Sequence, residues 1–230
     1  IRLFLFCCLS LKLAFAINLS NQAHQFQYAE GFILSQPQES SIPINQIMAD
    51  YRKLELRWVG KDNAAYNHIQ VAKNKLFAKT ELFNSNAIIE SNEKISYYRL
   101  KYQTPNQDGL QNVSGLMLLP SFNPKGIILF FHSTISGKLN VPSLHFKEYK
   151  AEMLASIFAA NGYIVVAPDY IGLGDNYAAM HPYILYPLPN VEDGKNILLA
   201  AVKYLQQNKL IDVKKTQLPL FVSGYSEGAS

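Results

Sequence analysis

The sequence predicts an α/β fold in which a mostly parallel sheet carries helices on both faces. Two short runs, 126–131 and 163–167, are apolar without alternation, which is typical of strands buried on both faces. A helical repeat of apolar residues occupies 147–160 between these strands, and a second such segment precedes a third strand at 218–223. Strands that alternate with helices of this length indicate βαβ units, whose crossover helices cover the faces of the sheet.

Turn and cap residues give the remaining boundaries. Two segments of strand-like pattern, 96–104 and 111–119, predict a hairpin, because Asp108-Gly109 between them supplies the positive φ that a tight turn demands. Asn161-Gly162 predicts the end of the first helix, since glycine tolerates the left-handed conformation there. Asn190 predicts the N-cap of the second helix.

Residues 1–16 have the pattern of a secretory signal peptide that is incomplete at its start, with an apolar run before Ala14-Phe15-Ala16. Lys12 interrupts the run, and a buried N-terminal helix or strand is the alternative interpretation. Cys7 and Cys8 both lie in this segment, so the mature protein would have neither disulfides nor zinc–cysteine chemistry. We therefore expect export to a periplasm or to the exterior.

A length of 230 residues gives room for one large domain, or for one domain with a small extra segment, and the composition, 49% hydrophobic and 17% charged, is that of a folded protein. A net charge of +4, scattered along the chain, does not indicate nucleic acid as a partner. No uncharged stretch reaches about 18 residues, so no transmembrane segment is predicted. Residues 17–92 are interpreted as an N-terminal extension, in which the Ser-, Gln- and Pro-rich segment 35–43 predicts a loop.

One motif carries chemistry: Gly224-Tyr225-Ser226-Glu227-Gly228, directly after the third predicted strand. G-x-S-x-G at a strand end is the pattern of a nucleophile elbow. The sharp turn lifts the serine hydroxyl clear of the sheet, and only small residues two positions before and after it let the backbones pass. The helix that follows directs free N–H groups at an anion forming beside the serine. A tight strand–helix turn with an incidental serine is the alternative.

With these residues the chain resembles the α/β-hydrolase superfamily, and within it the secreted lipase- or esterase-like members. The resemblance covers about 93–230 and includes the hairpin, the strand ending at Phe131, the segment 167–174 and the elbow. It implies that Ser226 is the nucleophile. It also implies an oxyanion hole formed by two backbone N–H groups, one from Glu227 and one from Ser133 or Thr134. Gly224 and Gly228 are the turn glycines on either side of the serine. The family often has His-Gly where this chain has His132-Ser133.

The family order is nucleophile, acid, then base, whereas every histidine of this chain precedes Ser226. We therefore expect His132 to support the oxyanion loop and Asp169 to hold its own loop, with Gly172 and Gly174 as turn residues. The loop 170–189 contains His181, Tyr183 and Tyr186, and it is predicted either to overhang the site or to be a solvated aromatic loop. The five histidines that precede the serine are His24, His68, His132, His145 and His181.

By this resemblance, 93–230 is the N-terminal portion of an α/β-hydrolase domain, truncated after the elbow, and its catalytic His and Asp/Glu lie beyond Ser230. The implied function is a secreted serine hydrolase acting on small-molecule or lipid carboxylic esters, without metal or organic cofactor. The chain as given would be inactive, because an unassisted serine hydroxyl is a weak nucleophile. A catalytically inactive binding module and a serine peptidase of the same fold are the alternatives. Nothing in the pattern indicates an oligomeric state.

Overall fold

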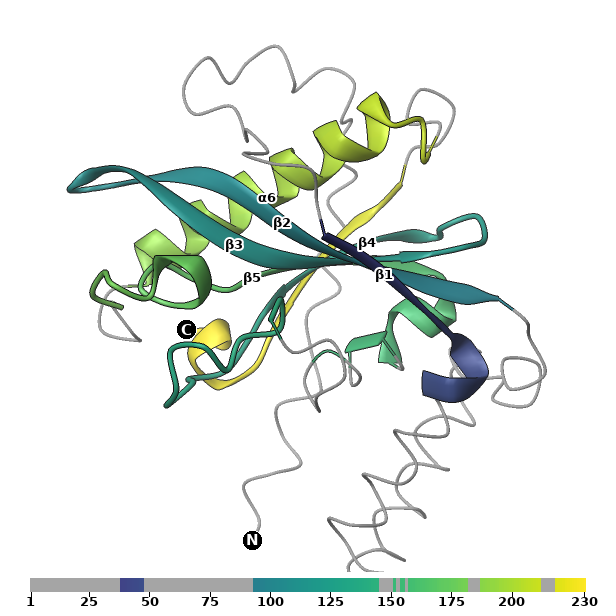
Figure 1. Cartoon of the computed structure of the whole chain (residues 1–230), viewed down its shortest axis with the longest axis horizontal. Helices are drawn as coiled ribbons and strands as arrows, with labels where there is room; N and C mark the ends of the chain where they lie inside the picture. Colours follow the sequence, from purple (N-terminus) through teal and green to yellow (C-terminus); the bar gives the residue numbers. More distant parts are fainter. Residues whose placement is uncertain are drawn as a thin grey trace, which may run out of the picture.

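A single mixed sheet lies between two helical layers in the computed structural model (Figure 1). The predicted signal peptide and most of the N-terminal extension lie outside the described residues. The structure describes residues 38–47, 93–144, 157–181, 187–211 and 218–230, together with Ala151, Leu154 and Ala155.

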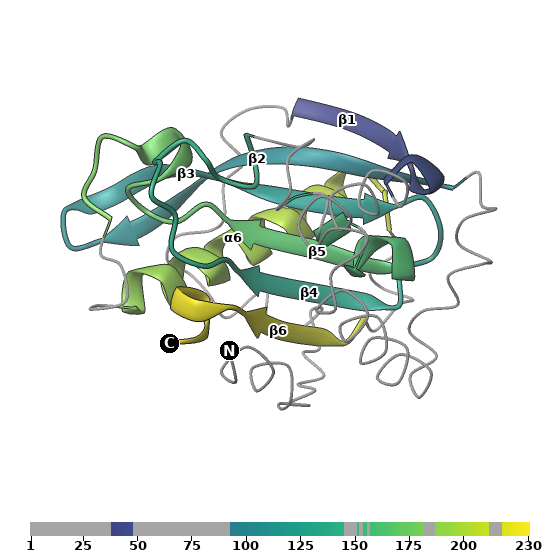
Figure 2. The same ribbon diagram turned by 90° about the horizontal axis from the view of Figure 1, so that it is seen from below.

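The strands follow the order β1-β2-β3-β5-β4-β6 across the sheet, as Figure 2 shows. The predicted strands are all present, within a few residues of the expected bounds. The bounds are β1 Gln38–Pro43, β2 Lys94–Asn106, β3 Gly109–Pro120, β4 Gly126–Phe131, β5 Tyr163–Pro168 and β6 Leu220–Gly224.

The prediction of a mostly parallel sheet is wrong, because the sheet is mixed. Strand β4 pairs in parallel with β5 and β6, but β1–β2, β2–β3 and β3–β5 pair antiparallel. The reason lies in the connections: the tight turn between Asn106 and Gly109 joins β2 to β3, and a turn this short permits only antiparallel pairing. Only the connections that contain helices give parallel neighbours.

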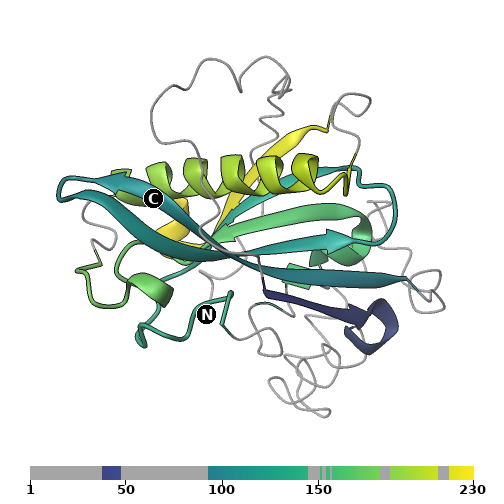
Figure 3. The same cartoon turned by 45° about the horizontal axis from the view of Figure 1, so that its top comes forward.

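Helices cover both faces of the sheet, as predicted. Helix α6, Leu188–Gln207, runs across one face (Figure 3) and packs its buried residues, among them Ile197 and Leu205, against apolar side chains of the strands. On the other face, the helical residues Leu154 and Ala155 precede the short helix η2, Ala159–Asn161. Each leucine or isoleucine buried in this way contributes roughly 1.5–3 kcal/mol. The first residues of that predicted helix, 147–150, lie outside the described residues.

Helix α6 begins three residues earlier than predicted, and Asn190 is not its cap. Pro187 occupies the N-cap position and Pro189 lies in the first turn, where the fixed φ of proline suits a helix start. Asn190 is therefore a buried residue of the helix, and its side-chain amide donates a hydrogen bond to Glu227 of the elbow.

The prediction of a loop at 35–43 is wrong for residues 38–43, because Gln38–Pro43 forms strand β1. This strand pairs only with β2 and ends at a proline, as an edge strand can, since one side of its backbone needs no partner. In the following helical turn, Ile44 and Ile47 are buried in the core beside the sheet. No helix in the described part of the chain is long and apolar enough to cross a lipid bilayer.

Candidate active site

The parallel strands β4, β5 and β6 end on the same side of the sheet (Figure 2), and Ser226 follows the end of β6 there. Strand β6 ends at Gly224, and the short helix η5, Ser226–Ala229, begins two residues later. Ser226 is exposed and has a φ of 56°, a left-handed conformation that costs a non-glycine residue about 1 kcal/mol or more. Such strain is what a sharp strand-to-helix turn requires, and it presents the serine side chain to solvent.

Two glycines allow this turn to lie directly on the sheet. A Cβ at Gly224 would be 1.9 Å from the carbonyl oxygen of Gly228, and a Cβ at Gly228 would be 2.2 Å from that of Phe131. The elbow is fixed to the end of β4 by the Tyr225 N–H, which donates to the Phe131 carbonyl at 3.2 Å. The close approach explains why G-x-S-x-G carries glycine at both ends here.

The loop after β4 reaches the same edge of the sheet. Phe131 and Gly224 are register partners, so Ser133 and Thr134 follow β4 at the level where Ser226 and Glu227 follow β6. Ser133 is half-buried and Thr134 is exposed. The two segments from which the sequence predicts an oxyanion hole are therefore neighbours.

Glu227 turns its side chain into the protein, away from the exposed Ser226. Its Oε1 lies 2.8 Å from Nε2 of His181, and the Asn190 amide donates to the same oxygen at 3.4 Å. The second ring nitrogen of His181, Nδ1, lies 2.7 Å from the carbonyl oxygen of Ile171. A buried ionisable pair thus sits directly beneath the elbow.

This pair was missed by the sequence analysis, which left the loop of His181 either over the site or solvated. His181 is buried, so a solvated position is wrong for this residue. Its partner lies 46 residues away in sequence, and no spacing rule connects the two. The other aromatic residues of that loop, Tyr183 and Tyr186, lie outside the described residues.

His132 has the supporting position that the sequence predicts. Its ring is buried, with Nδ1 2.7 Å from the Ser133 carbonyl oxygen and Nε2 3.2 Å from that of Asp169. The Tyr170 hydroxyl donates to the His132 carbonyl at 2.9 Å, and the two rings are in contact. His132 therefore holds the loop that follows β4 onto the segment that follows β5.

Asp169 holds its own loop in place, as predicted, by joining it to strand β3 and to the segment of Ser143. It accepts hydrogen bonds from the hydroxyl of Ser114 at 2.7 Å and from the backbone N–H and hydroxyl of Ser143. Burial raises the pKa of Asp169 from its ordinary 3.8 to about 6, although the hydrogen bonds from the two serines oppose this shift. The predicted turn residues Gly172 and Gly174 have φ values of 82° and 58°.

A second buried carboxyl lies on α6. Asp193 accepts a hydrogen bond from the Tyr102 hydroxyl at 2.6 Å. Burial raises the pKa of Asp193 to about 8, and the charge of Asp169 adds to this shift. Within the described residues, no group of three or more His, Cys, Asp and Glu side chains is placed to hold a metal ion.

Comparison with known proteins supports a fold but gives no family. No protein-family model and no curated protein sequence matches the chain. Among solved structures, a Legionella pneumophila protein provisionally named a hydrolase matches with a TM-score of 0.56 at 22% identity, over 84% of this chain and 45% of that one. This chain has a hydrolase fold.

The rice cell wall degrading esterase LipA from Xanthomonas oryzae has the same fold. One LipA variant matches with a TM-score of 0.51 at 28% identity, over 62% of this chain and 37% of LipA. A second variant matches at 27% identity with the same TM-score, over 64% and 38%. The chain therefore spans less than half the length of each of these structures.

Proposed function

We propose that this chain carries the nucleophile of a secreted serine hydrolase that cleaves carboxylic esters. The observation that carries the proposal is the exposed Ser226, held at a φ of 56° on a strand-to-helix turn and flanked by two sterically required glycines. The esterase LipA, which has the same fold, supports esters as the substrate class. Both small-molecule and lipid esters belong to this class.

In the proposed reaction, Ser226 Oγ attacks the acyl carbon of the ester while its proton passes to a histidine base. The oxyanion accepts hydrogen bonds from the backbone N–H of Glu227 and from that of Ser133 or Thr134. One such donor contributes about 3–4 kcal/mol of transition-state stabilisation. The histidine then protonates the leaving alcohol, and water releases the carboxylic acid from the acyl-enzyme.

We propose that the histidine base and its acidic partner come from beyond Ser230. The ring nitrogens of His132 and His181 face carbonyl oxygens and the Glu227 carboxylate, so neither ring is placed to take a proton from Ser226. The three remaining histidines precede the elbow and lie outside the described residues. Both neighbouring structures are more than twice as long as their matched parts, which leaves room for such partners.

We propose that the protein acts outside the cytoplasm, because residues 1–16 have the pattern of a signal peptide that ends at Ala16. The mass of the protein recovered from periplasm or culture medium checks this part, because the processed chain should begin at Ile17.

The catalytic proposal is tested by Ser226→Ala in the full-length protein that contains this chain, with p-nitrophenyl esters and matching anilides as substrates. We expect ester hydrolysis to fall by a factor on the order of 10⁶, as happens when a triad loses its serine. Ser223→Ala, in the adjoining strand, is the matched control and should retain activity. Ester hydrolysis that survives Ser226→Ala would contradict the proposal, and a preference for anilides would favour the peptidase alternative.

A further inference from the structure

Four buried side chains form a continuous row beneath the elbow, which we call the buried bridge: Glu227, His181, Tyr170 and His132. The Glu227 carboxylate meets His181 Nε2 at 2.8 Å. The His181 ring stacks on Tyr170 with 5.7 Å between centroids and an interplanar angle of 5°. Tyr170 in turn contacts the His132 ring at a centroid distance of 4.0 Å.

Each end of the buried bridge is attached to one of the two backbone segments that would hold the oxyanion. At one end, the side chain of Glu227 belongs to the residue after Ser226. At the other end, His132 Nδ1 lies 2.7 Å from the carbonyl oxygen of Ser133. The bridge therefore spans from the elbow, which follows β6, to the loop that follows β4.

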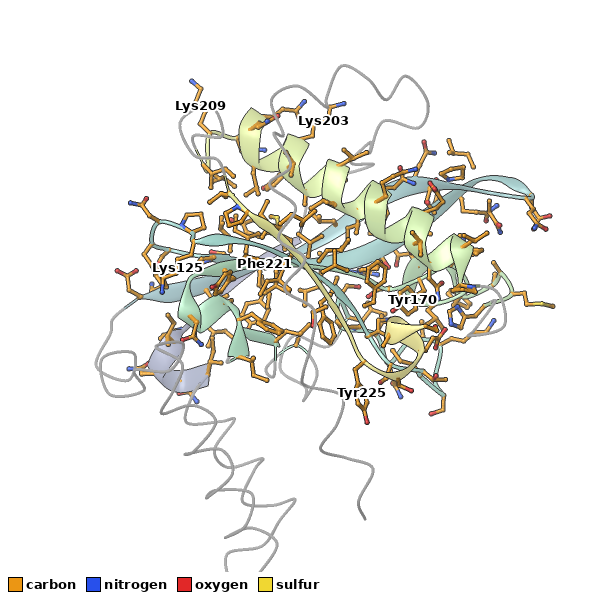
Figure 4. All side chains as sticks on the ribbon, turned by 180° about the vertical axis from the view of Figure 1, so that it is seen from behind. Lys125, Tyr170, Lys203, Lys209, Phe221 and Tyr225 are labelled. Carbon is orange, nitrogen blue, oxygen red and sulfur yellow. The ribbon has the colours of Figure 1, made fainter. Side chains whose placement is uncertain are left out.

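The bridge is buried. The side chains of His181 and Glu227 are 0% and 1% exposed, and Tyr170 is fully buried. Figure 4 shows Tyr170 between the start of α6 and the helical turn η5. Burial raises the pKa of Tyr170 well above its ordinary value, and the Glu227 charge adds to this, so the phenol stays protonated and donates to the His132 carbonyl. Removing one partner would leave a buried polar group unpaired, at a cost of about 1–3 kcal/mol. The row therefore has one strongly favoured arrangement.

Tyr170 itself is held in a conformation that it would not adopt unaided. Its φ is 75°, in the left-handed region that non-glycine residues seldom occupy. The strain places its ring between the two histidines, and also parallel to Phe131 at 6.3 Å, at the end of β4. A strained backbone beside a candidate site persists only where the surrounding contacts determine it.

We propose that His181 is a positioning residue for ester hydrolysis, which fixes through the buried bridge the separation of the two oxyanion-binding N–H groups. The inference rests on the proposed function. Its physical basis is that oxyanion donors act only when they lie 2.7–3.1 Å from the position of the developing charge. A bridge that ties Glu227 to the Ser133 loop sets this separation before substrate arrives.

The test compares His181→Phe, which keeps a ring against Tyr170 but cannot hydrogen-bond Glu227, with His181→Gln, whose amide can donate to the carboxylate. In the full-length protein that contains this chain, we measure kcat, KM, and inhibition by a boronic acid that forms a tetrahedral adduct with Ser226. His181→Phe should lower kcat by about 10–100-fold and weaken the boronic acid by a similar factor. KM should change less than about threefold, because ground-state binding does not use the donors. His181→Gln should recover most of the loss.

Thermal unfolding of each variant checks that it is folded. Where His181→Phe does not fold, Tyr170→Phe replaces it, because it keeps the ring and removes only the hydrogen bond to the His132 carbonyl. This variant should lower kcat and the boronic acid affinity together. Tyr177→Phe is the matched control at an exposed tyrosine outside the bridge and should change neither.

A folded His181→Phe variant with unchanged kcat and unchanged boronic acid inhibition would overturn the inference. Equal losses in substrate binding and boronic acid binding would also overturn it, since they indicate a general disturbance of the site. These outcomes differ from a failure of the proposed function, which would appear as activity that survives Ser226→Ala.

Discussion

At the scale of single residues, the position of Ser226 depends on the absence of side chains beside it. Gly228 passes so close to the end of β4 that a Cβ would overlap the Phe131 carbonyl group. The close packing of Gly228, two residues after Ser226, against β4 is therefore the reason for the exposed hydroxyl and the strained φ of Ser226. Any side chain at Gly228 must move the turn that presents the serine.

We expect Gly228→Ala to lower the free energy of unfolding by about 1–3 kcal/mol and to reduce esterase activity, because the added methyl forces the elbow away from β4. Urea unfolding followed by circular dichroism measures the first effect. Gly137→Ala is the matched control, since its Cβ would meet only the Asn140 side chain, at 2.8 Å and free to move. Equal stability of the Gly228 variant and the wild type would contradict the packing account.

The residue scale also shows where prediction from sequence ends. The motif around Ser226 indicated a sharp turn and a reason for its glycines, because that reason is local. The inward side chain of Glu227 and its contact with His181 could not be predicted, since they depend on how two distant loops meet at the sheet edge. Likewise, Asn190 was interpreted as a helix cap, and only the structure places it against Glu227.

At the scale of elements, a buried carboxyl joins α6 to strand β2. Asp193 on the helix accepts from Tyr102 on the strand, among apolar side chains and beside a second buried hydrogen bond, from Asn196 of α6 to Thr104 of β2. Burial raises the pKa of Asp193 to about 8, above the ordinary 3.8 of an unfolded chain. The folded state therefore holds this proton more tightly than the unfolded state does.

The consequence is a stability that falls as pH rises. The contribution of Asp193 is complete below about pH 4 and is lost progressively up to about pH 8, because over this range the unfolded chain releases the proton while the folded protein still holds it. Asp193→Asn keeps an acceptor for Tyr102 and removes the titration. The free energy of unfolding should then fall less steeply between pH 4 and 8, by up to about 1.4 kcal/mol per pH unit.

Urea unfolding at a series of pH values measures this slope. Glu192→Gln removes a carboxylate that is 45% exposed on the same helix, and it should leave the slope unchanged. A slope that is the same in Asp193→Asn and in the wild type would contradict the assigned protonation.

The elements themselves were largely predictable, because buried strands and an amphipathic helix leave a clear pattern of apolar residues. Their pairing was less so. The antiparallel hairpin of β2 and β3 was expected, but the antiparallel pairs β1–β2 and β3–β5 were not. Strand β1 was interpreted as a loop, because an edge strand rich in serine has neither the apolar run nor the alternation of a core strand.

At the scale of the whole molecule, the sheet brings the ends of β4, β5 and β6 to one edge, and the candidate site is assembled there from the segments that follow them (Figure 1). The residues that support the site come from three segments and from the start of α6. The general base and acid of the proposed triad are assigned to sequence beyond Ser230. The central claim is therefore that this framework presents Ser226 as the nucleophile of that triad.

The most direct test is to treat the full-length protein with a fluorophosphonate, which phosphonylates the serine of a working triad with loss of fluoride. Mass spectrometry of the digested protein then identifies the modified residue. The account predicts a single phosphonyl group on the peptide that contains Ser226, with ester hydrolysis lost in proportion to labelling. An esterase-active protein that is modified at another residue, or inhibited while Ser226 remains free, would contradict it.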